Sequence, residues 1–366
     1  MRIGIITFHR AYNCGAMLQA WALKTTLERM GHQVAFPIGD YNKVVPLWPP
    51  RTPLHDRCRC GSFARRCRSL VYRSFLTVIG KRTGITAGVF YDTFRRKYLP
   101  EIECEVADFG KNFDAIIVGS DQVLNPNIRG WTPYFLCRGT PQNLRKIAYA
   151  ASIGEKPLSA EVEADILSAL SSFSAVSVRE PFKGFPVMVD PTLLLKADDY
   201  NAIAATSVHR REYVYLYTLE ASEFEVTTAR TIADRLGLDL LITPTWGTFH
   251  RGNCHGMTNK ISPSFFVNYV KHAKYVLAGS FHGTALAVLH GKPFLNVIPD
   301  HRTTKRVSAM LVKIGEGDRV VNPDNDIDEM IVRLKRPLRE SCWQQLEQER
   351  QRSLDWLQKA IEGTLS

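Results

Sequence analysis

The chain begins MRIGIITFHRAYNCGAMLQAWALKTTLERMGHQV (residues 1–34), a sequence with the pattern of a strand, a loop, a helix and a second strand. The apolar stretch 2–8 predicts a first strand, and the residues from about 16 to 30 predict an amphipathic helix. Gly31 follows this helix directly, and glycine is a favoured helix stop. Such a start is typical of an α/β domain.

The rest of the chain repeats this alternation of strands and helices. The apolar run 113–119 predicts a buried parallel strand. Further strands are expected at 146–150, 175–178, 187–189, 213–217, 238–242, 274–278 and 293–297. Helices are expected at 160–173, 224–236, 263–272, 282–289 and 339–361. The pattern predicts an α/β fold with two domains, 1–190 and 191–366, in which the first carries a basic insertion at about 43–100 and the second ends in a helix.

The size and composition fit a soluble protein with two domains. The 366 residues are 45% hydrophobic and 23% charged, and a chain of this length exceeds one ordinary core. The apolar start is too short for a signal peptide, and no run approaches the roughly 18 apolar residues of a membrane span. We therefore expect a cytoplasmic protein.

The net charge of +11 is concentrated in one segment. Between residues 51 and 100, twelve Lys and Arg stand against two Asp. A patch of this kind suits an anionic partner such as a membrane surface, a lipid diphosphate or nucleic acid, although a solvated insertion has the same composition. No helix-turn-helix, zinc-finger or RNP motif is present, so we do not expect nucleic acid. The segment 51–97 is predicted to contact the inner face of the plasma membrane.

Two loops of the first domain carry candidate site residues. Two α/β domains place ligands in the cleft between them, at the carboxyl ends of the strands. Asn13 and Gly15 precede a helix N-terminus, which favours anions, although a cap and a tight turn would explain them equally well. Ser120 and Asp121 follow the strand at 113–118 and would line the cleft or the acceptor side, unless Asp121 is a helix cap.

An arginine and a histidine at two other strand ends could carry the chemistry. Arg179 ends the strand at 175–178, where its guanidinium either pairs with Glu180 or Asp190 or binds a carboxylate or phosphate. His282 lies in Ser280-Phe281-His282-Gly283, at a strand-to-helix turn. A helix N-terminus favours phosphate and histidine exchanges protons near neutral pH, so a functional role is preferred here over a structural one.

The order and spacing of several segments resemble those of the polysaccharide pyruvyl transferase family. The main segments are IGIITFHRAYNCGAMLQAWAL, FDAIIVGSDQVLNP, SVRE, VDPTLLL and SPSFFVNYVKHAKYVLAGSFHGTALAV. The likeness extends from residue 3 to about residue 312 and omits 43–90. It implies the GT-B architecture, in which two Rossmann-like domains face each other across a cleft. It also implies a transferase that moves the pyruvate unit of phosphoenolpyruvate to a sugar hydroxyl of a cell-surface or exopolysaccharide precursor, with a pyruvate ketal as product and phosphate released.

The resemblance also implies roles for individual residues. Arg179 would bind the donor, and His282 would donate a proton or hold phosphate as an imidazolium. Ser280 stands where some branches of the family carry an arginine, so Arg306 is the candidate for the second cationic contact. The backbone N–H groups between Ser280 and Gly283 would complete the donor site.

The expected chemistry requires neither a cofactor nor a metal, and the sequence shows no carboxylate cluster for one. The predicted partners are phosphoenolpyruvate and a saccharide acceptor, for which a lipid-diphosphate-linked precursor is one candidate. The main alternative is a GT-B glycosyltransferase that uses a sugar nucleotide, because a fold does not determine a reaction. A catalytically inactive scaffold in polysaccharide assembly is a third possibility.

Overall fold

The structure is a computed structural model that describes most of the chain. The described residues are 1–39, 88–128, 130–206, 209, 211–219, 221–243, 258, 260–299 and 305–365. Residues 51–87 of the basic segment 51–97 lie outside these ranges. The remaining residues of the segment belong to a helix at 88–98.

The first half of the molecule is built on a parallel sheet. Within the described residues this sheet has six strands in the order β3-β2-β1-β4-β5-β6. The strands are β1 (Arg2–Ile6), β2 (Gln33–Ile38), β3 (Glu101–Glu103), β4 (Ala115–Val118), β5 (Arg145–Ala151) and β6 (Ala175–Val178). The register pairs Ile6 of β1 with Val118 of β4, so the loops that follow these two strands begin side by side.

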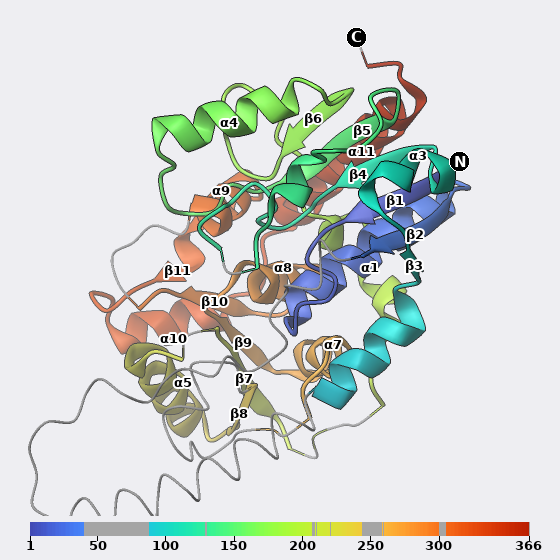
Figure 1. The fold of residues 1–366 in the computed structure, drawn as a ribbon. Helices are drawn as coiled ribbons and strands as arrows, with labels where there is room; N and C mark the ends of the chain where they lie inside the picture. Colours follow the sequence, from blue (N-terminus) through green and yellow to red (C-terminus); the bar gives the residue numbers. More distant parts are fainter. Residues whose placement is uncertain are drawn as a thin grey trace, which may run out of the picture.

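The second half contains a parallel sheet of five strands among the described residues, in the order β11-β10-β9-β7-β8. Its strands are β7 (Tyr213–Tyr217), β8 (Asp239–Thr243), β9 (Tyr275–Ala278), β10 (Phe294–Val297) and β11 (Val320–Val321). Side chains of β7 alternate between two buried clusters. Val214 and Leu216 belong to one with residues of helices α5 (Glu223–Leu236) and α10 (Ile327–Lys335), while Tyr213, Tyr215 and Tyr217 belong to a second cluster that also contains residues of the first half. The two sheets and their covering helices form two Rossmann-like units (Figure 1).

Helices cover both sheets. In the first half they are α1 (Cys14–Arg29), α3 (Phe109–Asn112) and α4 (Ala160–Leu170), together with the helical residues 88–98. In the second half they are α5 (Glu223–Leu236), α7 (Pro263–His272), α8 (Phe281–Leu289), α9 (Lys305–Lys313), α10 (Ile327–Lys335) and α11 (Glu340–Glu362). Short 3-10 turns are η2 (Val106–Asp108), η3 (Pro133–Leu136), η4 (Pro191–Leu193), η5 (Ala197–Ala202) and η6 (Gly317–Arg319). None of the helices in the described ranges is both long and apolar enough to cross a membrane.

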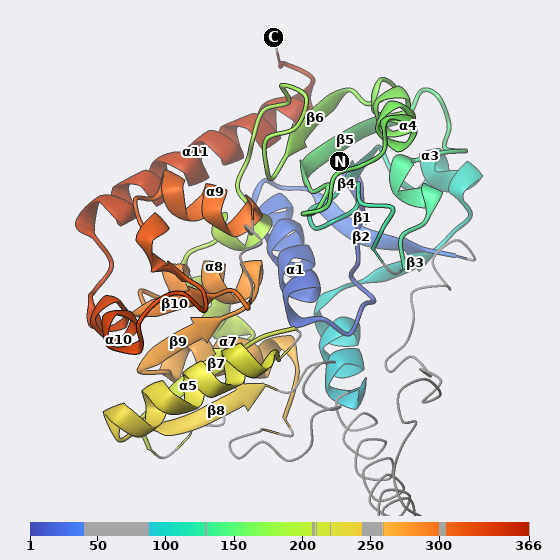
Figure 2. The same ribbon diagram turned by 90° about the vertical axis from the view of Figure 1, so that its left-hand side faces the viewer.

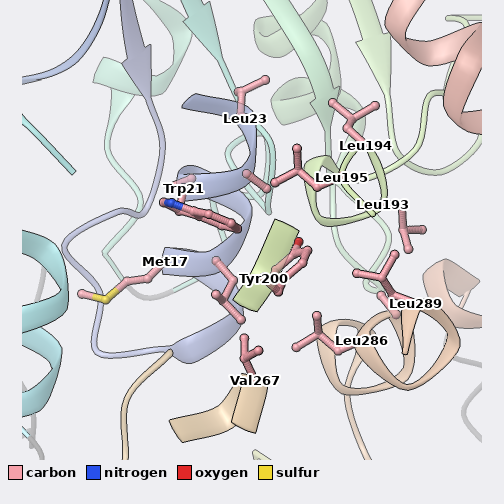
Figure 3. Close-up of a cluster of buried hydrophobic side chains, with 14 of the residues drawn as sticks. Met17, Trp21, Leu23, Leu193, Leu194, Leu195, Tyr200, Val267, Leu286 and Leu289 are labelled. Carbon is pink, nitrogen blue, oxygen red and sulfur yellow. The ribbon is translucent and has the colours of Figure 1, made fainter. Parts of the chain in front are cut away.

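Helix α1 lies between the two halves and packs against both (Figure 2). Its apolar side chains belong to one buried cluster with residues of η4, α7 and α8. Figure 3 shows Trp21 of α1 beside Tyr200, with Val267 and Leu286 nearby. The rings of Trp21 and Tyr200 meet edge to face, with 5.1 Å between their centroids. A continuous apolar core therefore joins the halves, which fixes the strand ends of one relative to those of the other.

The last helix, α11, returns to the first half. Its Ser353 hydroxyl accepts a hydrogen bond from the backbone N–H of Val189, and its Trp356 ring lies 6.1 Å from that of Tyr149 in β5. Arg145 of β5 donates a hydrogen bond to the carbonyl of Ile361. The position of α11 beside β5 is visible in both ribbon views (Figures 1 and 2). The division of the chain at residue 190 remains a prediction.

Most predicted elements are confirmed, and one is wrong. The strand at 213–217 and the helix at 263–272 have the expected bounds, and the helix predicted at 16–30 spans Cys14–Arg29. The expected strand 187–189 is only an isolated bridge between Val187 and Val178. The reason is that the neighbouring Val189 uses its N–H for Ser353 and its carbonyl for the Tyr149 hydroxyl, which leaves neither group for a ladder.

Candidate functional site

The candidate residues of the first sheet follow the carboxyl ends of β4 and β6. Ser120 is fully buried, and its N–H donates to the side chain of Gln19, 3.0 Å away. Gln19 in turn donates to the Thr7 hydroxyl at 2.7 Å, so one buried amide joins α1 to the ends of β1 and β4. Sequence reasoning missed Gln19. A polar residue on the apolar side of a predicted helix is the signal that could have found it.

Asp190 is the residue around which the site is organised. Its Oδ2 accepts a hydrogen bond from Arg179 Nη1 at 2.7 Å and one from the Ser120 hydroxyl at 3.3 Å. The same oxygen lies 3.5 Å from His282 Nε2. Three candidate site residues, two from the first half and one from the second, therefore meet at one carboxylate.

The Asp190 carboxylate remains ionised although it is buried. Burial alone raises the pKa of this group, but the interactions with His282, with Arg179 and with the backbone N–H of Thr192 outweigh it. The pKa of Asp190 is therefore held well below its usual range. From the sequence, this residue was considered only as a partner for Arg179.

Arg179 is enclosed by carboxylates. Besides its bond to Asp190, its Nη2 lies 3.8 Å from Asp121 Oδ1 and its Nε lies 3.9 Å from Glu180 Oε2. Both distances are too long for hydrogen bonds, so these two guanidinium nitrogens have no hydrogen-bond partner within the described part of the chain. Burial lowers the pKa of Arg179, yet Asp190, Asp121 and Glu180 together raise it above its ordinary value. The guanidinium is stacked 4.5 Å from the centre of the Phe281 ring.

Glu180 holds a neighbouring turn rather than Arg179. Its Oε1 accepts hydrogen bonds from the Ser152 hydroxyl at 2.7 Å, from Ile153 N–H at 2.7 Å and from Gly154 N–H at 3.2 Å. Of the two internal partners considered for Arg179, Asp190 is the one within hydrogen-bond distance. A donor-binding role for Arg179 stays a prediction that rests on its two remaining nitrogens.

His282 lies in the first turn of α8, between Asp190 and α1. Only 9% of the residue is exposed, and its Nε2 has no hydrogen-bond partner among the residues that the structure describes. On the other side of the ring, a Cβ at position 15 would lie 2.2 Å from His282 Nδ1, closer than any real contact. Gly15 is thus a glycine because α1 approaches the imidazole so closely.

The other candidates on helix termini have local roles in the structure. Asn13 caps α1, with its side chain accepting a hydrogen bond from Ala16 N–H at 3.1 Å. Ser280 caps α8 and accepts from Gly283 N–H at 3.1 Å. Gly283 itself is tightly packed, because a Cβ there would lie 3.0 Å from both Ala278 and Tyr217. These contacts hold the positive ends of two helix dipoles close to His282.

Arg306 lies in α9, and its Nε donates a hydrogen bond to Glu155 Oε1 of the first half at 2.7 Å. Arg306 and Arg179 line one pocket, together with Asp190 and Phe281. The remaining walls of this pocket are largely apolar and come from residues 187–189, from α9 and from α11. Sequence reasoning did not anticipate Glu155, whose contact with Arg306 bridges the two halves.

No group of three or more His, Cys, Asp or Glu side chains placed to share a metal ion occurs within the described ranges. Asp121, whose carboxylate lies 3.8 Å from the Arg179 guanidinium, has a φ of 68°, a conformation rare outside glycine. Its Oδ1 accepts a hydrogen bond from Gln122 N–H at 2.9 Å, so the side chain is held by its own turn. Whether it lines the acceptor side remains a prediction.

The chain is similar in fold to several solved structures. A protein from Listeria monocytogenes assigned as a UDP-N-acetylglucosamine 2-epimerase aligns over 100% of this chain and 97% of its own, with 12% identity and a TM-score of 0.53. A UDP-GlcNAc 2-epimerase from Methanocaldococcus jannaschii aligns over 98% and 99%, with 11% identity and a TM-score of 0.47. The glycosyltransferase SnogD from Streptomyces nogalater aligns over 98% and 99%, with 13% identity and a TM-score of 0.44. The two parallel sheets, together with the likeness to the Listeria protein, define the GT-B arrangement of two Rossmann-like domains, and at these identities the likeness concerns the fold alone.

The chain belongs to the polysaccharide pyruvyl transferase family. The sequence model of this family matches residues 13–301, which include all the candidate site residues except Arg306. No curated protein sequence gives a match. The protein is therefore a transferase of this family on a GT-B scaffold.

Proposed function

We propose that this protein transfers the pyruvate unit of phosphoenolpyruvate to a sugar of a cell-surface or exopolysaccharide precursor, forming a ketal and releasing phosphate. Family membership supports the class of reaction. The observation that carries the proposal is that Arg179 of the first half and His282 of the second meet at the Asp190 carboxylate, at the carboxyl ends of strands in both sheets. A guanidinium and an imidazole are the groups that an acid-catalysed reaction of a small dianion needs.

The chemistry assigns three tasks to the site. Protonation of phosphoenolpyruvate at C3 makes C2 electrophilic, and one sugar hydroxyl adds to C2. A second hydroxyl of the same sugar then displaces phosphate from C2, which closes the ketal. Of the two hydroxyl protons lost, one balances the proton added at C3 and the other leaves with phosphate. The site must therefore hold two anionic groups, supply one proton and orient the acceptor.

The three carboxylates around Arg179 limit how much this residue alone could contribute to binding the anionic donor. Asp121, Glu180 and Asp190 surround this single guanidinium, so Arg179 alone offers little net positive charge to a dianion. Two further groups are close: Arg306, which lines the same pocket as Arg179, and the N-terminus of α8, whose first N–H groups have no partner within the helix. We assign the donor's carboxylate and phosphate to these three groups together. His282 is assigned as the proton donor to C3 or as an imidazolium that holds the phosphate.

Binding of phosphoenolpyruvate should raise the melting temperature of the protein. A ligand at about 100 times its Kd stabilises the folded state by about 2.7 kcal/mol. Arg306→Gln should reduce the shift, because this partly exposed residue adds one of the cationic contacts. Pyruvate and inorganic phosphate, tested alone, serve as the controls for binding of each half of the donor.

The same measurement separates the proposal from the glycosyltransferase alternative. A shift with sugar nucleotides and none with phosphoenolpyruvate would overturn the pyruvyl transfer proposal. The product assay then uses labelled phosphoenolpyruvate with a panel of lipid-diphosphate-linked sugars, in which the label should enter the saccharide as phosphate is released.

We also propose a cytoplasmic location in which the basic segment 51–97 contacts the inner face of the plasma membrane. Binding to vesicles that contain anionic lipid should weaken as salt rises, because ions screen exposed charges over about 10 Å at 0.1 M. Co-sedimentation with anionic and neutral vesicles measures this effect. Replacing Arg65, Arg66 and Arg68 with glutamine should weaken binding to anionic vesicles. Binding that is absent, or that is insensitive to both salt and these changes, would exclude the contact.

A further inference from the structure

We propose that Asp190 is a positioning residue that orients the His282 imidazole and links it to Arg179, an inference that rests on the proposed function of the same site. Asp190 follows β6 and precedes η4, in the segment that connects the two halves. Its carboxylate contacts Arg179 and Ser120 of the first half and His282 of the second. Within the described part of the chain, Asp190 thus contacts both Arg179, the proposed donor-binding residue, and His282, the proposed proton donor.

The two carboxylate oxygens of Asp190 have separate tasks. Oδ1 accepts hydrogen bonds from the Thr192 N–H at 2.9 Å and the Thr192 hydroxyl at 2.8 Å. These local bonds fix the plane of the carboxylate. Oδ2 is thereby directed at Arg179, Ser120 and His282. An ionised carboxylate that is 1% exposed is costly unless it is paired, so its partners in this cluster constrain one another.

The position of the imidazole follows from this arrangement. Gly15 of α1 limits the ring on its Nδ1 side, and Asp190 faces Nε2. A carboxylate next to one ring nitrogen favours the tautomer that carries hydrogen on that nitrogen. Among the described residues, the ring faces the Asp190 carboxylate on one side and the α1 backbone on the other, with the Phe281 ring edge to face at 5.4 Å and the Arg179 cation beyond Asp190. Asp190 would thus set both the orientation of His282 and the nitrogen that retains its hydrogen.

The first test compares Asp190→Asn with a matched control. Glu316 is also fully buried, but its carboxylate pairs with Arg319 and accepts a hydrogen bond from the Arg339 N–H, and no contact with Arg179, Asp190 or His282 is found for it in the described part of the chain. Glu316→Gln should lower the melting temperature. At temperatures below the melting temperature of the variant, kcat should equal that of the wild type. Asp190→Asn should lower kcat about tenfold, and combination with His282→Ala should cause no further loss beyond that of His282→Ala alone. Losses that multiply in the double variant would overturn the proposal.

The second test needs no substrate and therefore separates this inference from the proposed function. In protein labelled with ¹⁵N-histidine, the His282 signals are assigned by their loss in His282→Asn. The neutral ring should carry hydrogen on Nε2 in the wild type and in Glu316→Gln, and its nitrogen shifts should change in Asp190→Asn. Unchanged His282 shifts in Asp190→Asn would overturn the contact, even if the enzyme uses phosphoenolpyruvate. A clear change would support it, even if phosphoenolpyruvate proves not to be the donor.

A milder variant keeps the test decisive if Asp190→Asn does not fold. Thr192→Val removes one hydrogen bond to Oδ1 while it retains the shape of the side chain and the charge of Asp190. The carboxylate would then be less firmly oriented, so we expect a two- to threefold loss of kcat and a measurable change in the His282 nitrogen shifts. Wild-type shifts and kcat in Thr192→Val would count against the proposal.

Discussion

Replacement of His282 by alanine is expected to lower kcat by roughly 10²–10⁴-fold, the range that a well-placed general acid contributes. The imidazole lies in the first turn of α8, beside the Asp190 carboxylate, and both side chains are buried. No other described histidine contacts this carboxylate, so its loss leaves the reaction without a neighbouring acid. Release of phosphate from phosphoenolpyruvate in the presence of the acceptor measures the effect.

The balance between kcat and KM distinguishes the two roles proposed for His282. A proton donor acts in the transition state, so its loss lowers kcat, whereas an imidazolium that holds phosphate in the ground state raises KM for phosphoenolpyruvate. His290→Ala is a suitable control, because His290 caps the opposite end of the same helix. Near-normal kcat and KM in His282→Ala would remove this residue from the mechanism.

Replacement of Gly15 by alanine is expected to lower kcat about 100-fold by displacing His282. A methyl group at position 15 would lie 2.2 Å from Nδ1 and 2.4 Å from Cγ of that ring, so the ring must move. A shift of about 1 Å in a catalytic group can cost 10²-fold in rate. Alanine favours a helix over glycine by about 0.5–1 kcal/mol, so the helix itself gives no reason for a loss. Steady-state kcat, measured below the melting temperature, reports the effect.

Gly110→Ala is the matched control for this substitution. Gly110 is an exposed glycine in α3, and a Cβ there would meet Pro141 at 3.5 Å, an ordinary contact. This variant should keep wild-type activity. If Gly15→Ala keeps it as well, the close approach of α1 to His282 has no part in catalysis.

The elements and the local caps could be read from the sequence because their determinants are close together along the chain. The strand at Tyr213–Tyr217 follows from a short apolar run. The caps at Asn13 and Ser280 each depend on a hydrogen bond to an N–H three residues later. For Asn13 the sequence allowed either a cap or a site residue, whereas Ser280 was considered only for the donor site; the structure shows that both side chains are caps next to the site.

The hydrogen-bond partners of the site residues could not be predicted from the sequence, because they depend on how the two halves pack together. Gln19 reaches Ser120 across 101 residues, and Arg306 reaches Glu155 across 151. The choice of Asp190 over Glu180 as the partner of Arg179 depends on the turn at 152–154, which occupies the Glu180 carboxylate. The wrong strand at 187–189 has a similar cause, since the competing hydrogen bond at Val189 comes from a helix about 160 residues later.

The helix shared by the two halves has a consequence for how the protein is made. Translation completes the first sheet at residue 178, but the apolar side of α1 is covered by η4, α7 and α8, the last of which ends at Leu289. Chains begin to fold from their amino terminus while the ribosome is still at work. The nascent amino-terminal half must therefore display Trp21 and its apolar neighbours until roughly a hundred more residues have emerged. During that interval the exposed apolar surface makes the nascent chain prone to aggregation.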